Sequence, residues 1–149
     1  MGNSLSCIFR QQIYATENAK KGDEKAQYVI GYMYHKGKGV PKNYVKAACW
    51  YKKAAEHKNT KALNNLAYLY QKGCGVEQNL KKAEELLLES AKQGDDVACL
   101  NLGIMYQTGK NGNANLSKAE YWYKKAMDGG NRIAAGMYKR IVTMENKTK

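Results

Sequence analysis

The chain has 149 residues, a length that fits one domain and leaves little room for two. Lys and Arg number 25 against 13 Asp and Glu, and hydrophobic residues make up 44% of the chain, enough for a real core. One proline and one phenylalanine argue against a β-sandwich and against a linker-rich chain. No apolar run approaches 18 residues, so no membrane span is predicted, and residues 1–13 lack the pattern of a secretory signal.

The four cysteines show no metal-binding pattern. Cys7, Cys49, Cys74 and Cys99 have no CxxC spacing, and no histidine lies at ligand spacing from any of them. We therefore predict four free thiols in a reducing compartment, and neither a metal nor a cofactor.

A period of 36 residues runs through the chain. Alanine, tyrosine, glycine and asparagine all return at this step, at Ala26, Ala62, Ala98 and Ala134, Tyr34, Tyr70 and Tyr106, Gly37, Gly73 and Gly109, and Asn43, Asn79 and Asn115. Such self-similarity is typical of solenoids, in which stacked units bury a face that no single unit can bury alone. The sequence therefore predicts an all-α solenoid of tandem repeats.

Each period is predicted to form two helices. In the first unit, Ile30, Met33 and Tyr34 fall on one helical face, while Trp50 and Tyr51 belong to the apolar surface of the second helix. An Asp or Asn precedes each first helix and can serve as its N-cap, as Asn43 and its repeats can for the second helix. The repeated glycines end the first helix, where a left-handed residue is wanted.

In chain order, the pattern predicts half a pair, three full pairs and half a pair within one domain. Residues 8–22 are expected to form a capping helix, residues 24–59, 60–95 and 96–131 three full repeats, and residues 132–145 a final half repeat. Gly31, Ala67 and Gly103 lie in mid-helix, where glycine costs ~1 kcal/mol against alanine. We therefore expect a neighbouring helix to approach closely at these residues.

Residues 26–55, AQYVIGYMYHKGKGVPKNYVKAACWYKKAA, resemble the Sel-one-like repeat, a relative of the tetratricopeptide repeats. The resemblance covers about residues 26–131 and implies a right-handed α–α superhelix of helix-turn-helix repeats that acts as an adaptor between other proteins. The second unit departs from the pattern with Leu86 and Leu87 in place of the aromatic pair, and the third departs in its loop at residues 110–113. A cysteine-rich branch has disulfides between paired helices, but the cysteines here lack that spacing.

The resemblance also implies a concave groove lined by the first helix of each pair. Counting from the mid-helix small residue by the tetratricopeptide pattern predicts thirteen groove residues: Lys25, Tyr28, Tyr32, His35, Lys36, Lys61, Asn64, Tyr68, Gln71, Lys72, Leu100, Ile104 and Gln107. One end of this set is tyrosine and lysine, and the other is aliphatic. We therefore expect a protein or peptide partner with acidic and apolar portions, since tyrosine buries much area at modest entropic cost. The alternative for each residue is packing against the neighbouring pair.

The first six residues fit the N-myristoylation pattern M-G-x-x-x-[ST], with Gly2 as the acceptor and Cys7 as a candidate for palmitoylation. One myristoyl chain binds membranes only marginally, whereas a second acyl chain makes the attachment stable. The expected localisation is the cytoplasm or a host cytosol, with membrane association if the N-terminus is acylated. A simple lead-in to the capping helix is the alternative.

The sequence does not favour catalysis. His35 and His57 are the two histidines, and no nucleophile elbow, zinc-helix motif or phosphate loop is present. The Gly37-x-Gly39 pair returns as Gly73-x-Gly75, so it belongs to the repeat and not to a nucleotide site. We therefore predict that the chain is not an enzyme.

Two further functions stay open at this stage. The net charge of +12 favours nucleic-acid binding, but nearly all of the excess is lysine, and arginine is the better reader of phosphate and base edges. Five acidic residues also interrupt any continuous basic stripe: Glu84, Glu85, Glu89, Asp95 and Asp96. The other alternative is a secreted bacterial effector or immunity protein that acts by protein binding.

Overall fold

The computed structural model describes residues 3–110, 112 and 114–147, which form eight α-helices and no strand. The helices are α1 (Asn3–Lys20), α2 (Glu24–Lys36), α3 (Tyr44–Glu56), α4 (Thr60–Lys72), α5 (Leu80–Lys92), α6 (Asp96–Thr108), α7 (Leu116–Asp128) and α8 (Arg132–Lys147). Six of them, α2 to α7, have 13 residues each, as expected from copies of one unit.

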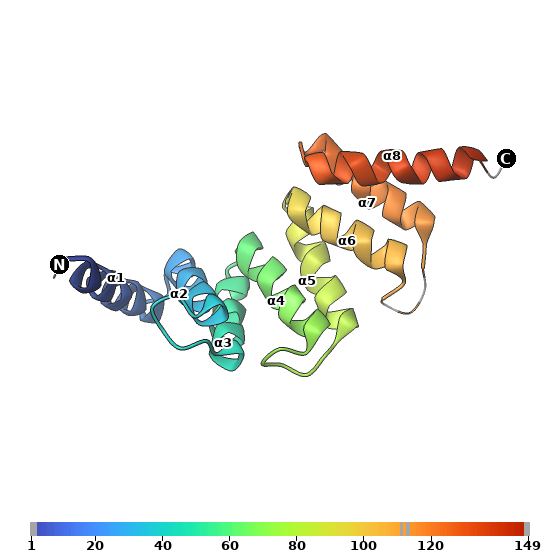
Figure 1. Ribbon diagram of the computed structural model, residues 1–149. Helices are drawn as coiled ribbons and strands as arrows, with labels where there is room; N and C mark the ends of the chain where they lie inside the picture. The colour runs from blue at the N-terminus through green and yellow to red at the C-terminus, as the bar shows by residue number, and fades with distance from the viewer. Residues whose placement is uncertain (1–2, 111, 113, 148–149) are drawn as a thin grey trace. The chain divides into compact units, whose positions relative to one another are not determined.

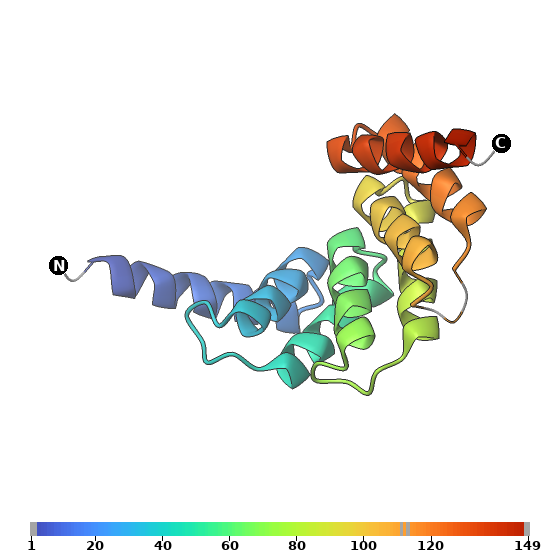
Figure 2. The ribbon, with the colours of Figure 1, turned by 45° about the vertical axis from the view of Figure 1, so that its right-hand side comes forward.

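The chain divides into two compact units, Met1–Asn79 and Leu80–Lys149. In unit 1, α1 packs on α2, α2 on α3, and α3 on α4 (Figure 1). In unit 2, the same order of packing joins α5, α6, α7 and α8. Figure 2 shows the loops that join the helices of each pair, α2 to α3 in the first repeat and α6 to α7 in the third.

The helix ends follow the predicted capping chemistry. The side chains of Asp23 and Asn59 each accept a hydrogen bond from the backbone N–H three residues further on, at the start of α2 and α4. Asn43 and Asn115 do the same for α3 and α7. After α2, α4 and α6 the chain turns through a left-handed glycine, with φ of 69°, 68° and 64° at Gly37, Gly73 and Gly109. The predicted caps are therefore confirmed at these four helix starts and three helix ends.

The mid-helix glycines accommodate a tyrosine of the following helix. A Cβ at Gly31 would lie 2.6 Å from Cδ1 of Tyr51, and one at Gly103 would lie 2.5 Å from Cδ1 of Tyr123. Both tyrosines are fully buried. The close approach predicted from the sequence is therefore present in the first and third repeats. In α8 the same position carries Lys139, which is exposed.

The two terminal helices are longer than predicted. The N-terminal helix starts at Asn3, five residues before the expected start at residue 8, because neither glycine nor proline interrupts the chain between Asn3 and Lys20. It ends before Gly22, which has a φ of 94°. The last helix continues to Lys147, two residues past the expected end.

Candidate functional site

Predicted groove residues of the first two repeats come together on one face of unit 1, formed by α2 and α4. His35 of α2 stacks on Tyr68 of α4, with 5.8 Å between ring centroids and 19° between ring planes. Tyr28 and Tyr32, one turn apart on α2, have centroids 6.1 Å apart. We call Tyr28, Tyr32, His35 and Tyr68 the aromatic cluster.

Tyr51 of α3 lies beneath the aromatic cluster and holds it in place. Its ring stacks on Tyr28 with centroids 6.0 Å apart, and its hydroxyl oxygen lies 3.1 Å from His35 Nδ1. The same oxygen accepts a hydrogen bond of 3.2 Å from Asn65 Nδ2 of α4. One hydroxyl therefore joins three helices, and Gly31 makes room for the ring that carries it.

Burial favours the neutral forms of three side chains at this site, His35, Tyr28 and Tyr51. Burial lowers the pKa of His35, and the positive charges of Lys36 and Lys42 lower it further. Burial raises the pKa of both Tyr28 and Tyr51. These three side chains therefore present ring surface and hydrogen-bonding groups in their neutral forms.

Lysine side chains lie beside two rings at this site, those of Tyr32 and Tyr44. The Lys36 and Lys38 ammonium groups lie 6.0 and 5.4 Å from the ring centroid of Tyr32. Lys42 lies 5.0 Å from the ring centroid of Tyr44, whose edge in turn contacts His35 at 5.6 Å between centroids. All three lysines are exposed, and none forms a salt bridge within the described part of the chain.

Positive charge is concentrated in unit 1. Between Lys25 and Val76 the sequence has ten lysines and a single acidic residue, Glu56. All five acidic residues that interrupt the basic pattern along the sequence lie instead in unit 2, in α5 and around the start of α6. The face of α2 and α4 therefore combines exposed aromatic surface with an almost unopposed positive charge.

The corresponding face of α6 in unit 2 is aliphatic. Val97 is 45% exposed, Ile104 is half-buried and Leu100 is buried. At the base of this face, the Tyr123 hydroxyl donates a hydrogen bond of 2.6 Å to Gln107 Oε1. This pair stands two repeats after His35 and Tyr51, with glutamine in place of histidine.

The thirteen predicted groove residues differ in exposure. Five are exposed: Lys25, Lys36, Lys61, Tyr68 and Lys72. Six are half-buried: Tyr28, Tyr32, Asn64, Gln71, Ile104 and Gln107. His35 and Leu100 are buried, because their side chains turn into the packing between helices, so they support the face and are not contact residues. Gly2 lies outside the described residues, as does the side chain of Cys7.

Sequence reasoning missed the lysines of the loop after α2. Lys38 and Lys42 lie in a loop, whereas the predicted groove residues were counted only along the first helices. Their positions beside Tyr32 and Tyr44 depend on the conformation of that loop. The available signal was composition, since this stretch of sequence has no acidic residue from Lys25 to Ala55.

Other kinds of site were also sought among the described residues. No group of three or more His, Cys, Asp or Glu side chains there is placed to hold a metal ion. Cys49, Cys74 and Cys99 are free thiols. No helix in this part of the chain is long and apolar enough to cross a bilayer.

Tandem helix pairs with a period of 36 residues define an all-α helical-repeat solenoid, as the sequence predicted. The Sel1 repeat family matches three consecutive segments, 24–59, 60–95 and 96–131, which together make up more than two thirds of the chain. The chain therefore belongs to the Sel1 repeat family, and the predicted resemblance is confirmed. Sel1 repeat proteins generally mediate protein–protein interactions, and the fold is typically a non-enzymatic scaffold.

Three relatives illustrate the similarity. A Sel1 repeat protein from Oxalobacter formigenes is 35% identical, with a TM-score of 0.72 over 78% of this chain and 47% of that one. The protective antigen c5321 of uropathogenic Escherichia coli strains, which has an SLR fold, is 31% identical, with a TM-score of 0.81 over 85% of this chain and 27% of that one. Chitin synthase regulator SKT5 of Saccharomyces cerevisiae is 42% identical over 51 residues, 34% of this chain and 7% of that protein. The chain thus spans less than half the length of each.

Proposed function

We propose that this chain is a non-enzymatic adaptor that binds a protein or peptide partner through its first helices, α2 and α4 in unit 1 and α6 in unit 2. The observation that carries this proposal is the aromatic cluster with its surrounding lysines. Aromatic side chains that are partly exposed and held rigidly from below are typical anchors of protein interfaces, because little entropy is lost when a partner covers them. Tyr68 is 44% exposed, while His35 beneath it is buried.

The partner in this proposal has an acidic portion that contacts unit 1. Lysine ammonium groups already lie beside the rings of Tyr32 and Tyr44, so an approaching carboxylate would meet positive charge at the edge of an aromatic surface. An apolar portion of the partner suits the α6 face, where Val97 and Ile104 offer aliphatic surface. The charge would chiefly accelerate association, and the rings would supply most of the affinity.

The proposal is tested by affinity capture with the full chain, read by mass spectrometry. Wild type is compared with a Tyr32→Ala, Tyr68→Ala double variant, and the matched control is Tyr121→Ala, an exposed tyrosine of α7 in unit 2. We expect a protein partner that wild type and the control retain and the folded double variant loses. Equal capture by all three proteins would place binding elsewhere and refute the assignment to α2 and α4.

Nucleic-acid binding is a second candidate, because the acidic residues that argue against it lie in unit 2 and leave unit 1 strongly basic. Two features make it weaker. Unit 1 has one arginine, Arg10, and lysine ammonium groups lie beside several of the rings on which bases would stack. A single-stranded oligonucleotide that bound with a steep salt dependence, and bound no less tightly after Tyr32→Ala and Tyr68→Ala, would show charge attraction alone.

Acylation of the N-terminus and the resulting compartment are also proposals. Co-expression of the chain with a eukaryotic N-myristoyltransferase, followed by intact mass measurement of wild type and Gly2→Ala, tests the first. A mass increase in wild type alone would support membrane tethering, whereas equal unmodified masses would refute it. A role as a bacterial effector or immunity protein would be compatible with the same binding face, and identification of the captured partner would decide it.

A further inference from the structure

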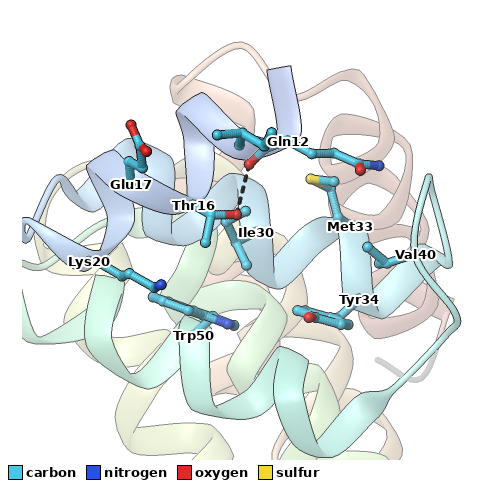
Figure 3. A pocket seen from close by; sticks show the side chains of 10 residues that line it. Gln12, Thr16, Glu17, Lys20, Ile30, Met33, Tyr34, Val40 and Trp50 are labelled. Carbon is cyan, nitrogen blue, oxygen red and sulfur yellow. Dashed lines mark hydrogen bonds between the residues drawn. The ribbon is translucent and has the colours of Figure 1, made fainter. Parts of the chain in front are cut away.

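A cleft of about 380 Å³ lies in unit 1 on another side of α2, between α1, α2 and α3 (Figure 3). Its apolar walls come from the side chains of Ile13, Ile30, Met33, Val40 and Trp50. The ring of Tyr34 also lines it, as do Thr16 and the charged residues Glu17 and Lys20 of α1. Figure 3 shows Trp50 and Tyr34 on the side opposite Thr16. None of these residues belongs to the aromatic cluster.

The cleft exists because α1 carries a short side chain where later repeats carry a long one. One period after Thr16 stands Lys52, whose ammonium group lies 5.9 Å from the ring centroid of Tyr70, the residue one period after Tyr34. Two periods after Thr16 stands Leu88, which is half-buried in unit 2. Thr16 turns its hydroxyl back to donate to the Gln12 backbone oxygen at 2.7 Å, so it leaves the space beside Tyr34 open.

At the position of Gln12, which lines the cleft, unit 2 carries a carboxylate. There the hydroxyl of Tyr106, two periods after Tyr34, donates a hydrogen bond to Glu84. In unit 1 the residue two periods before Glu84 is Gln12, whose amide donates instead to the Gly39 backbone oxygen at 2.8 Å. At the positions of Thr16 and Gln12, unit 2 therefore carries a half-buried leucine and a carboxylate that accepts from a tyrosine, Leu88 and Glu84.

The charges around the cleft favour an acidic occupant. Lys46 lies 5.2 Å from the ring centroid of Tyr34, and Lys53 lies 4.5 Å from that of Trp50. Together with Lys20 in the cleft wall, these lysines outnumber the single carboxylate of Glu17. A negative group beside the aliphatic side chain would thus gain from its surroundings.

We propose that this cleft is a second protein-binding site, which takes a leucine-sized aliphatic side chain of a partner segment together with a neighbouring carboxylate. The aliphatic side chain occupies the space beside Thr16, against Ile30, Met33 and Trp50, and the carboxylate accepts from the Tyr34 hydroxyl. The cleft does not include the face of α2 and α4, so an experiment can refute binding at one of these two sites without refuting binding at the other. Residues 84–89 of this chain, EELLLE, show the required chemistry in a helix.

The test uses a capped synthetic peptide with the sequence of residues 80–92 as the probe, titrated into the full chain and followed by NMR. We expect shifts of the Trp50 indole and of the Ile13, Ile30 and Met33 methyl signals. A probe with alanine for Leu88 should bind roughly tenfold more weakly or worse, because the side chain is the buried anchor. Tyr34→Phe should weaken binding of the original probe but not of a probe with alanine for Glu84, which has no side-chain acceptor for the Tyr34 hydroxyl.

Thr16→Leu is the decisive protein variant, since it places in α1 the residue that unit 2 already has at this position. It should abolish the shifts while leaving the thermal midpoint unchanged or higher, and Thr16→Ser is the matched control that keeps the cleft open. Absence of shifts in wild type would overturn the proposal, as would shifts that survive Thr16→Leu. Shifts with 4-methylpentanoate but not with the peptide would also overturn it, in favour of a small-acid site. Capture through Tyr32 and Tyr68 is unaffected by any of these results.

Discussion

The first and third repeats share one internal arrangement and differ in what surrounds it. In both, a mid-helix glycine receives a buried tyrosine of the second helix, Gly31 with Tyr51 and Gly103 with Tyr123. In both, the tyrosine hydroxyl pairs with a residue of the preceding helix, a histidine in the first repeat and Gln107 in the third. The glycine–tyrosine contact is therefore part of the scaffold.

The surroundings separate the two repeats. Around Tyr51 lie other rings, and exposed lysines lie beside one ring of that cluster, Tyr32, whereas the α6 face is aliphatic. The buried contact is thus common to both repeats, while the exposed positions near it differ in their chemistry. A variant of the buried pair should thus cost similar stability in both repeats, and a variant of an exposed position should change binding in one of them.

The largest effect is expected from filling the glycine positions. Gly31→Ala and Gly103→Ala should each lower the free energy of unfolding by about 1–3 kcal/mol, because the new methyl group would overlap a buried ring, and this outweighs the higher helix propensity of alanine. Urea unfolding of both variants measures it. A stabilised variant would show that the ring moves aside without cost.

The second repeat supplies the control for this experiment, because it pairs Ala67 with Leu87 at the same positions. Adding Tyr51→Leu to Gly31→Ala reproduces that pair and should recover part of the loss. A double variant whose losses simply added would contradict the steric explanation.

The next effect concerns the tyrosine hydroxyls. Tyr51→Phe should cost about 1–3 kcal/mol, since it removes the partner of buried His35 and of Asn65. Tyr123→Phe removes one hydrogen bond to a half-buried glutamine and should cost about 1 kcal/mol. Urea titrations rank the two, and hydrogen exchange should place the Tyr51→Phe loss in unit 1. The opposite ranking would refute the central role given to Tyr51.

The third prediction separates the two repeats by pH. The pKa of His35 is lower in the folded chain than its ordinary value of 6.5, so the unfolded chain takes up this proton first as the pH falls. The contribution of neutral His35 to the free energy of unfolding is complete above pH 6.5 and is lost progressively as the pH falls below 6.5. His35→Gln, which copies the third repeat, should make unfolding free energy less dependent on pH in this range. His57→Gln is the control, and equal pH profiles for wild type and His35→Gln would contradict the prediction.

The smallest effect is expected at the turn between repeats. Gly22, Lys58, Gly94 and Gly130 stand one period apart, and all have positive φ, with 60° at Lys58. In this conformation the Cβ of a lysine is strained against its own backbone, whereas glycine has no Cβ. Lys58→Gly should therefore raise the free energy of unfolding by about 1 kcal/mol, as measured by urea titration. A loss of stability would mean that the lysine side chain compensates for its backbone.

Much of the fold follows from the period alone. Caps such as Asn43 and Asn59 and the terminal glycines mark the helix ends, because capping depends on residues only a few positions apart. The start of α1 was misplaced, since outside the full repeats no second copy shows where a helix should begin. The division into two compact units has no local sequence marker.

The candidate site was less predictable. Helical spacing predicted Tyr32 and Tyr68 as groove residues, and both lie on the face formed by α2 and α4. The burial of His35 was missed, since it depends on a hydroxyl 16 residues away in the next helix. The cleft beside Thr16 was not predicted either. It depends on the short side chain of Thr16, which stands where later repeats have the longer Lys52 and Leu88, and the sequence comparison considered only residues that repeat.

The most direct test of the account is to remove charge from one unit at a time. Binding of the captured partner is measured for Lys36→Gln, Lys38→Gln, Lys42→Gln as one triple variant, and for Lys118→Gln, Lys124→Gln, Lys125→Gln as its match in unit 2. Both remove three positive charges, so net charge cannot distinguish them. We expect the unit 1 triple variant to bind at least roughly tenfold more weakly and with a lower salt dependence, while the unit 2 triple variant changes little. Equal losses, or a larger loss in unit 2, would contradict the assignment of the binding face to α2 and α4.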